Sequence, residues 1–222
     1  MNLVSLAQRS TLPGVVLLAF VPMAASAKPI AFSHGTTVMA EYGAGTMKEA
    51  QVFYAPKYFL SLGGGYLELE SDLDHRRREI TYARVNYLAK RWNMESAQAN
   101  VFVWGGVGQA YVSEVNEHQF AGNAGAQVDY ETRRVYSSLK TDLFRSADFS
   151  HRIDTLQLGL APYKHDYDTL ATWVVVQARR YTGEIHEGTE WALLLRLFKR
   201  GGWIEAGVTD EGKLQAMAMV NF

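Results

Sequence analysis

The stretch Thr189-Glu190-Trp191-Ala192-Leu193-Leu194-Leu195-Arg196-Leu197-Phe198 decides the fold class. When it is extended, one face carries large apolar side chains, which are Trp191, Leu193, Leu195 and Leu197. Arg196 lies on the opposite face. Alternation with a period of two residues predicts a β-strand with one apolar and one polar face.

The same alternation recurs along the chain, most clearly in residues 77–89, 122–131 and 202–208. Polar or glycine-containing breaks separate the apolar stretches, as expected for many strands joined by turns. We predict an all-β fold of twelve strands, at residues 36–43, 48–54, 58–69, 77–89, 97–112, 122–131, 134–145, 152–162, 169–182, 189–198, 202–208 and 212–222. The alternative is ten strands, because the first two and the last two are shorter than the roughly 9–11 residues that a tilted membrane-spanning strand needs.

An antiparallel up-and-down transmembrane β-barrel fits this pattern, because a closed barrel pairs all its backbone groups within hydrocarbon. A soluble β-sandwich or lipocalin-like barrel also alternates, with its apolar face inward. Longer charged breaks at 71–76, 113–121 and 182–188 roughly alternate with short ones, as external loops and periplasmic turns do. Aromatic residues fall near strand ends, as interfacial girdles require; they are Tyr42, Tyr54, Tyr58, Tyr87, Trp92, Tyr111, Tyr163, Tyr181, Trp191 and Trp203.

Residues 1–27 differ from the rest of the chain and predict a secretory signal peptide. Arg9 supplies the positive start, residues 15–21 form a short apolar core, and Ala25-Ser26-Ala27 offers a cleavage site between small residues. The apolar core is far shorter than the ~20 residues of a spanning helix. We therefore expect one mature domain, residues 28–222, which forms the barrel.

The composition of this domain excludes several classes of protein. It holds 21 of the 22 basic residues and all 23 acidic residues, so no net positive field attracts nucleic acid. The chain has no cysteine, which excludes disulfides and thiolate metal sites. The prolines Pro29, Pro56 and Pro162 avoid the interiors of the predicted strands, where a missing N–H would break a ladder.

The last predicted strand ends on Phe222, and Ala216, Ala218 and Val220 share the face of that residue. Such a strand resembles the C-terminal strand of Gram-negative outer-membrane β-barrel proteins. The resemblance implies an outer-membrane location among lipids and lipopolysaccharide. It also implies that the barrel assembly machinery recognises this strand, with Phe222 as the assembly signal. An even number of strands places both termini on the periplasmic side.

The strand faces opposite the apolar residues predict a polar lumen of mixed charge. Such a lumen suits either a wetted pore or a closed interior in which the charges pair. We therefore expect a small passive pore or an envelope scaffold. The predicted lumen-lining residues are Arg84, Asn86, Gln127, Asp129, Glu131, Lys140, Asp142, Gln157, Gln177, Arg179, Arg196 and Glu205.

Histidines and methionines suggest an alternative function, an accessory barrel for binding or efflux of copper or another heavy metal. Met217 and Met219 would point into the lumen, where thioethers either bind Cu(I) or fill an irregular interior. Imidazole near carboxylates suits zinc, copper or nickel, although polar loops also gather histidines without any metal. The histidines that the predicted topology places in four external loops are His75, His118, His151 and His186.

A lipid-modifying enzyme is the other alternative, because some outer-membrane barrels use serine with histidine and an acidic or amide partner. The adjacent residues Ser150 and His151 point to opposite faces of a strand, so they form no dyad by themselves. Ser113 and His118 share a predicted loop, but no motif gives them a role. The sequence therefore identifies no catalytic residue.

Overall fold

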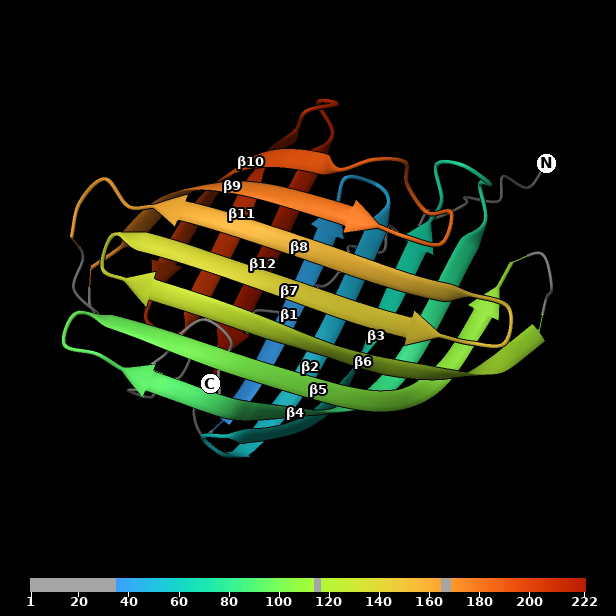
Figure 1. The fold of residues 1–222 in the computed structure, drawn as a ribbon, viewed down its shortest axis with the longest axis horizontal. Coiled ribbons are helices and arrows are strands. Elements are labelled where there is room, and N and C mark those ends of the chain that lie inside the picture. Colours follow the sequence, from blue (N-terminus) through green and yellow to red (C-terminus); the bar gives the residue numbers. More distant parts are fainter. Residues whose placement is uncertain (1–34, 114–116, 165–168) are drawn as a thin grey trace, which may run out of the picture.

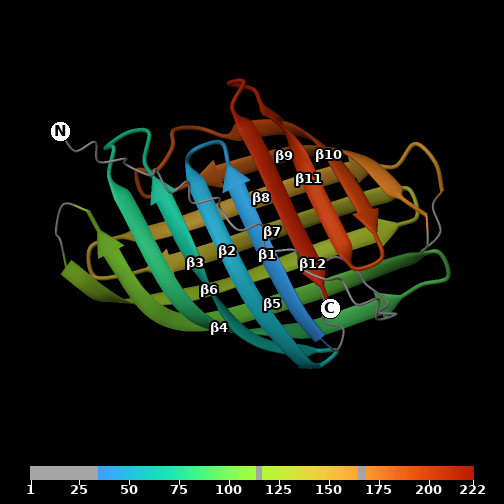
Figure 2. The same ribbon diagram turned by 180° about the vertical axis from the view of Figure 1, so that it is seen from behind.

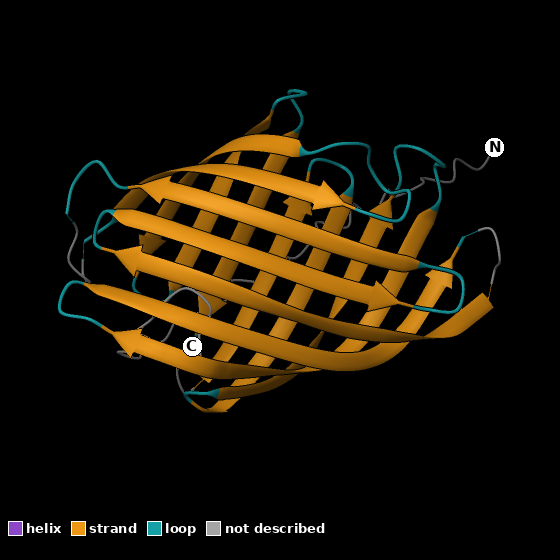
Figure 3. Cartoon of the chain, in the orientation of Figure 1, coloured by secondary structure: helices purple, strands orange, loops and turns teal. Residues whose placement is uncertain are grey.

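The computed structural model describes residues 35–113, 117–164 and 169–222, and these consist of strands, turns and loops (Figures 1 and 3). The predicted signal peptide, residues 1–27, lies outside the described residues. No helix in the described part is long and apolar enough to cross a membrane. The twelve strands of the described part are β1 (Gly35–Gly43), β2 (Met47–Lys57), β3 (Leu60–Glu70), β4 (Arg77–Asn93), β5 (Ala97–Val112), β6 (Glu117–Thr132), β7 (Val135–Arg145), β8 (Ser150–Leu160), β9 (Ala171–Tyr181), β10 (Glu190–Lys199), β11 (Gly202–Thr209) and β12 (Leu214–Asn221).

The strands form one closed antiparallel barrel in chain order. Each strand pairs with its neighbours in the sequence, and β12 returns to pair with β1, where Met39 lies opposite Met219. Figure 1 shows β5 to β8 crossing in front of the other strands, and Figure 2 shows β1, β2 and β12 side by side on the other face. Closure leaves no sheet edge on which another chain could pair.

The prediction of a closed twelve-strand barrel is confirmed, and the ten-strand alternative is wrong. β1 and β12, which are short, pair along most of their lengths with each other and with their other neighbours. Several boundaries differ from the prediction, and those of β6 and β2 have a clear structural reason. β6 begins earlier, at Glu117, because the long strand β5 pairs with it as far as Val112. β2 continues through Pro56, which lies at an irregularity in the ladder, where a missing N–H is tolerated.

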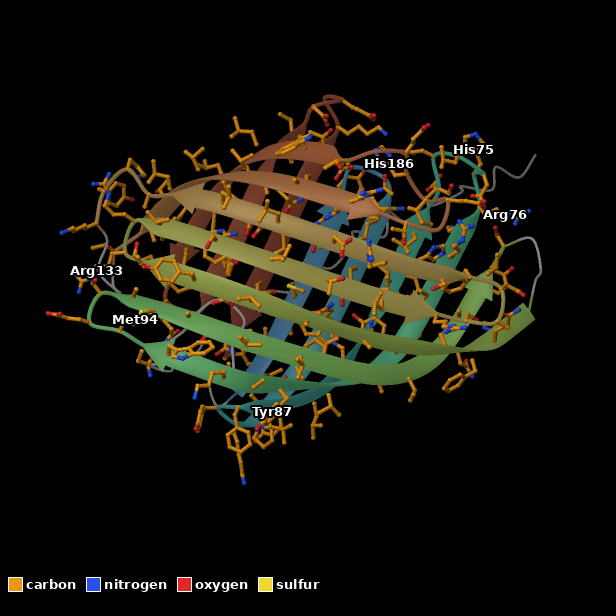
Figure 4. All side chains as sticks on the ribbon, viewed as in Figure 1. His75, Arg76, Tyr87, Met94, Arg133 and His186 are labelled. Atoms are coloured by element: carbon orange, nitrogen blue, oxygen red, sulfur yellow. The ribbon has the colours of Figure 1, made fainter. Side chains whose placement is uncertain are left out.

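The two ends of the barrel have different connections. The terminal end, which holds Gly35 and Asn221, has turns of two or three residues except for the longer connection 161–170. That connection departs from the expected alternation of short turns and long loops. The far end, opposite to it, carries longer loops such as 71–76 and 182–189. Figure 4 labels residues at both ends: His75, Arg76 and His186 lie at the far end, and Met94 and Arg133 at the terminal end.

Large apolar side chains cover the outside of the barrel. In the middle of β10, Leu193 is 57% exposed and Leu195 is 49% exposed. The prediction that Tyr181 and Trp203 belong to an outer girdle is wrong, because both lie on inward faces and are buried. Exposed aromatic residues flank the apolar belt; they are Tyr54, Tyr58, Tyr87, Trp92, Tyr130 and Tyr163 towards the terminal end, and Tyr42, Tyr66, Phe120 and Trp191 towards the far end.

Glycines inside the barrel make room for aromatic rings. A Cβ atom at Gly65 would lie 2.6 Å from the hydroxyl of Tyr82, and one at Gly125 would lie 2.4 Å from Nε1 of Trp104. Real Cβ atoms do not approach other atoms this closely, so larger residues would displace the rings. The glycine-rich stretch of β3 therefore serves packing.

Candidate functional site

The barrel encloses a cavity of about 170 Å³. Its wall extends from Glu41 and Gln215, in the far half, to Thr37 and Trp203, near the terminal end. Of the residues predicted to line the lumen, Asp129, Asp142 and Arg196 are buried beside the cavity, and Glu131 is partly buried on the same face of β6 as Asp129. The others line the cavity itself; they are Arg84, Asn86, Gln127, Lys140, Gln157, Gln177, Arg179 and Glu205.

Arg196 is the centre of one polar cluster in the interior. Its Nε donates a hydrogen bond to Glu205 at 2.8 Å, and its Nη2 donates to Gln157 at 2.8 Å. Its guanidinium also lies 4.4 Å from the ring centroid of Tyr136 and 4.2 Å from that of Trp203. A buried arginine that is paired, hydrogen-bonded and stacked in this way has a fixed position.

Arg84 forms a second cluster on the cavity wall. Its guanidinium lies 4.9 Å, 5.3 Å and 5.2 Å from the ring centroids of Phe53, Tyr82 and Trp104. Its Nη1 is 3.6 Å from a carboxylate oxygen of Asp142, which also accepts a hydrogen bond from Trp104 at 2.8 Å. The aromatic rings narrow the interior at this level and hold the cation against the wall.

The remaining cations of the cavity wall also have acidic partners. Arg179 pairs with Glu41, and Lys140 pairs with Asp142 at 2.8 Å. The wall therefore alternates positive and negative groups and produces no field of a single sign. Because charge selectivity in pores comes from rings of like charge, we expect this lumen to discriminate weakly between anions and cations.

Apolar side chains cluster in the interior at the far end, and we call this group the far-end plug. The side chain of Ile185, which comes from the loop between β9 and β10, is 0% exposed within it. The plug lies between the cavity and the far mouth on the side of the barrel formed by β2 to β9. Its members are Met47, Leu67, Leu69, Ile80, Tyr82, Ala110, Val112, Ala121, Phe144, Phe149, Ile153, Tyr181 and Ile185.

The loop that carries Ile185 crosses the far mouth. β3 and β9 lie on opposite sides of the ring of strands. Even so, two hydrogen bonds join the β9–β10 loop to the β3–β4 loop. Ser71 Oγ donates to the carbonyl oxygen of Glu184 at 2.6 Å, and the N–H of Asp72 donates to the carbonyl oxygen of Ile185 at 2.9 Å. Gly183 adopts a φ of +76°, which glycine tolerates because it has no Cβ. A Cβ there would also lie 2.5 Å from Nδ1 of His151, so the inward turn needs glycine at this position.

Asp72 joins three loops over the mouth. Its Oδ2 lies 2.9 Å from Nδ1 of His186, in the β9–β10 loop, and 3.5 Å from Nζ of Lys213, in the β11–β12 turn. Burial raises the pKa of Asp72, but the hydrogen bond to His186 and the charge of Lys213 more than offset this, so its pKa lies below its usual range. The ionised carboxylate therefore stabilises the closed loop.

Acidification should weaken this closure. A lowered pKa stabilises the folded arrangement above the ordinary aspartate pKa of about 3.9, and this stabilisation is lost as the pH falls through the folded value. We expect single-channel openings of the barrel in planar bilayers to become more frequent as the pH falls below the ordinary aspartate pKa of about 3.9. In the variant D72N, openings should already be frequent at pH 7 and should change less with pH. Identical pH profiles for both proteins would contradict the role of Asp72.

The four histidines considered as a metal site do not converge. His75 and His186 lie in loops, but His118 lies in β6 and His151 in β8, so the prediction that all four lie in loops is wrong. Both strands begin earlier than predicted, because their first residues are polar and resemble loop residues. Among the described residues, no group of three or more histidine, aspartate and glutamate side chains could hold a metal ion.

His151 has a structural environment and no serine partner. It is 2% exposed and stacks on Phe149 with ring centroids 4.6 Å apart. Its Nδ1 lies 3.3 Å from the carbonyl oxygen of Thr182, so it supports the start of the crossing loop. Ser150 is exposed on the other face of β8, and the adjacent pair therefore forms no catalytic dyad.

Three methionines face the cavity where the barrel closes. Met217 and Met219 of β12 line it, and Met39 joins them from β1. Met39 lies opposite Met219 in the ladder, and Glu41 lies opposite Met217. The sequence alone does not point to Met39, because nothing local shows that the first strand pairs with the last. Two features of the sequence could have indicated this residue. Met39 lies on the same face of its strand as the charged Glu41, and a closed barrel must pair its first strand with its last.

Comparisons with known proteins give a structural likeness but no match in sequence. No protein-family model matches the sequence, and no curated protein does. Among solved structures, the chain is similar to one described as the KdgM porin in complex with disordered oligogalacturonate. The TM-score is 0.47 and the sequence identity is 9%, over 85% of this chain and 98% of that chain. A likeness at this level assigns no function to the barrel.

Proposed function

We propose that this chain is an outer-membrane β-barrel that forms a narrow channel for small polar solutes, with a far mouth closed by its own loop. The outer face of the barrel supports membrane insertion most directly. Leu193 and Leu195 are exposed, whereas Arg196, next to them in β10, is 3% exposed inside. A water-soluble barrel would expose the arginine and bury the leucines, because large exposed apolar surfaces are rare on soluble monomers.

The connections support an orientation with the terminal end in the periplasm. Short turns are typical of the periplasmic side and longer loops of the external side. Near the far end, Arg145, Arg152 and Arg180 are exposed on the neighbouring strands β7, β8 and β9. Guanidinium groups bind phosphate well, so this side suits lipopolysaccharide in the outer leaflet. Recognition of β12 by the barrel assembly machinery stays a prediction.

The interior supports a gated channel better than an open passive pore. A cavity whose wall carries polar groups and paired charges offers a path for small solutes, but the far-end plug and the loop with Ile185 obstruct it from outside. Apolar constrictions of this kind gate pores by excluding water. An envelope scaffold would be equally blocked, and it would stay silent in planar bilayers even after the loop is removed.

Membrane insertion predicts a strong effect of a charge on the outer belt. Leu195 lies between Val174 of β9 and Ala206 of β11. Replacing it in L195R should destabilise the inserted barrel by roughly 2–4 kcal/mol, the cost of a basic residue near the bilayer midplane. We expect wild-type protein in the outer-membrane fraction to migrate differently on gels before and after boiling. The L195R variant should give much less of this heat-modifiable band.

The matched control is E187R, which places the same side chain at an exposed position of the β9–β10 loop. This variant should assemble like the wild type. Equal yields for L195R and E187R would argue against lipid contact at Leu195. Recovery of the wild type only from the soluble periplasm would overturn the membrane location.

A further inference from the structure

We infer that Met39, Met217 and Met219 form a binding site for a soft monovalent cation, Cu(I) or Ag(I), inside the barrel. All three side chains line the same cavity. The inference rests on the inward geometry of β1 and β12 and is independent of conduction and of membrane location.

The strand register brings the three thioethers within reach of one ion. Met39 and Met219 are direct cross-strand partners, and Cβ atoms of such pairs lie about 4.5–5.5 Å apart. Met217 and Met219 are separated by one residue on the same face of β12, which corresponds to roughly 7 Å along the strand. Methionine has three rotatable bonds beyond Cα, so its sulfur can move several ångströms from these positions. Met39 and Met217 are only partly buried, and the cavity leaves space for an ion.

The surroundings favour a soft ion of low charge. Glu41 and Glu205 both lie opposite Met217, from β1 and β11. Each pairs with an arginine, Arg179 or Arg196, so the net charge near the thioethers is close to zero. A divalent ion such as Zn²⁺ prefers imidazole, thiolate or carboxylate ligands, whereas thioethers select Cu(I). The site therefore selects by the softness of its ligands.

The distribution of methionines also supports a site. Besides the three at the seam, the described residues include only Met47, in the far-end plug, and Met94, in an exposed turn. Trp203 lies opposite Met219 in β11 and also lines the cavity. An indole ring attracts a nearby cation through its π electrons. Methionines that only fill an irregular core need no such grouping beside a cavity.

Titration of the folded barrel in detergent with Ag(I) tests the site, because Ag(I) resists oxidation under these conditions. We expect calorimetry to show one tightly bound equivalent in the wild type. The variants M39L, M217L and M219L keep side-chain volume, and each should weaken binding at least about ten-fold, with loss in the triple variant. X-ray absorption should show sulfur around the bound silver. Heat-modifiable migration verifies that each variant is folded.

The matched control is M94L, which removes a thioether from an exposed turn and should bind Ag(I) like the wild type. Zn²⁺ should compete poorly for the site. Equal Ag(I) affinity in the wild type and the triple leucine variant would overturn the proposal and leave these methionines as packing residues. Wild-type binding no tighter than millimolar would also overturn it.

Discussion

Removal of the crossing loop should open the barrel. When residues 183–188 are replaced by two glycines, we expect single-channel conductance in planar bilayers to rise by roughly an order of magnitude over the wild type. The variant loses Ile185 from the far-end plug and also loses the bonds of Ser71 and Asp72 across the mouth. Water can then enter a passage that the apolar side chain had kept dry.

Two controls separate gating from general damage to the barrel. E187A changes an exposed side chain of the same loop and should leave the conductance unchanged. M94G loosens a turn at the terminal end, away from the plug, and should also behave like the wild type. If the loop-deleted barrel is folded by its gel migration but conducts no better than the wild type, the channel proposal fails and a scaffold role replaces it.

Disruption of the buried Arg196–Glu205 pair should cause the largest loss of stability from a single substitution inside the barrel. Both side chains are 4% exposed and their charged atoms are 2.8 Å apart. In R196M the carboxylate of Glu205 stays buried without its cation, and breaking such a pair costs about 3–5 kcal/mol. Unfolding by urea in lipid vesicles, followed by tryptophan fluorescence, measures this loss.

A second substitution tests whether the loss comes from the unpaired charge. The double variant R196M/E205L removes both charges and should regain most of the stability, because apolar replacement of a buried pair is often neutral. K48M breaks the more exposed Lys48–Glu68 pair and should cost less than about 1 kcal/mol. If R196M and R196M/E205L are equally unstable, packing of the guanidinium against Tyr136 and Trp203 dominates instead.

The candidate site was predictable only in part. The inward orientation of Arg84, Gln177 and Glu205 follows from alternation along single strands, which is a local property. Their partners do not follow from it. The stacking of Arg196 on Tyr136 and Trp203 joins three strands, and its distances depend on register across the barrel. The inward path of Ile185 was also invisible, because a charged loop normally extends into solvent.

The sequence by itself determined the fold class and which face of most strands is apolar, and it favoured twelve strands over ten. Each of these depends on side-chain period and turn residues within one segment. Only the tertiary structure decided that Met39 meets Met219, that Asp72 joins three loops, and that Tyr181 and Trp203 face inward. The physical reason is that closure of the ring fixes the register between distant strands, and no local pattern in a single strand encodes that register.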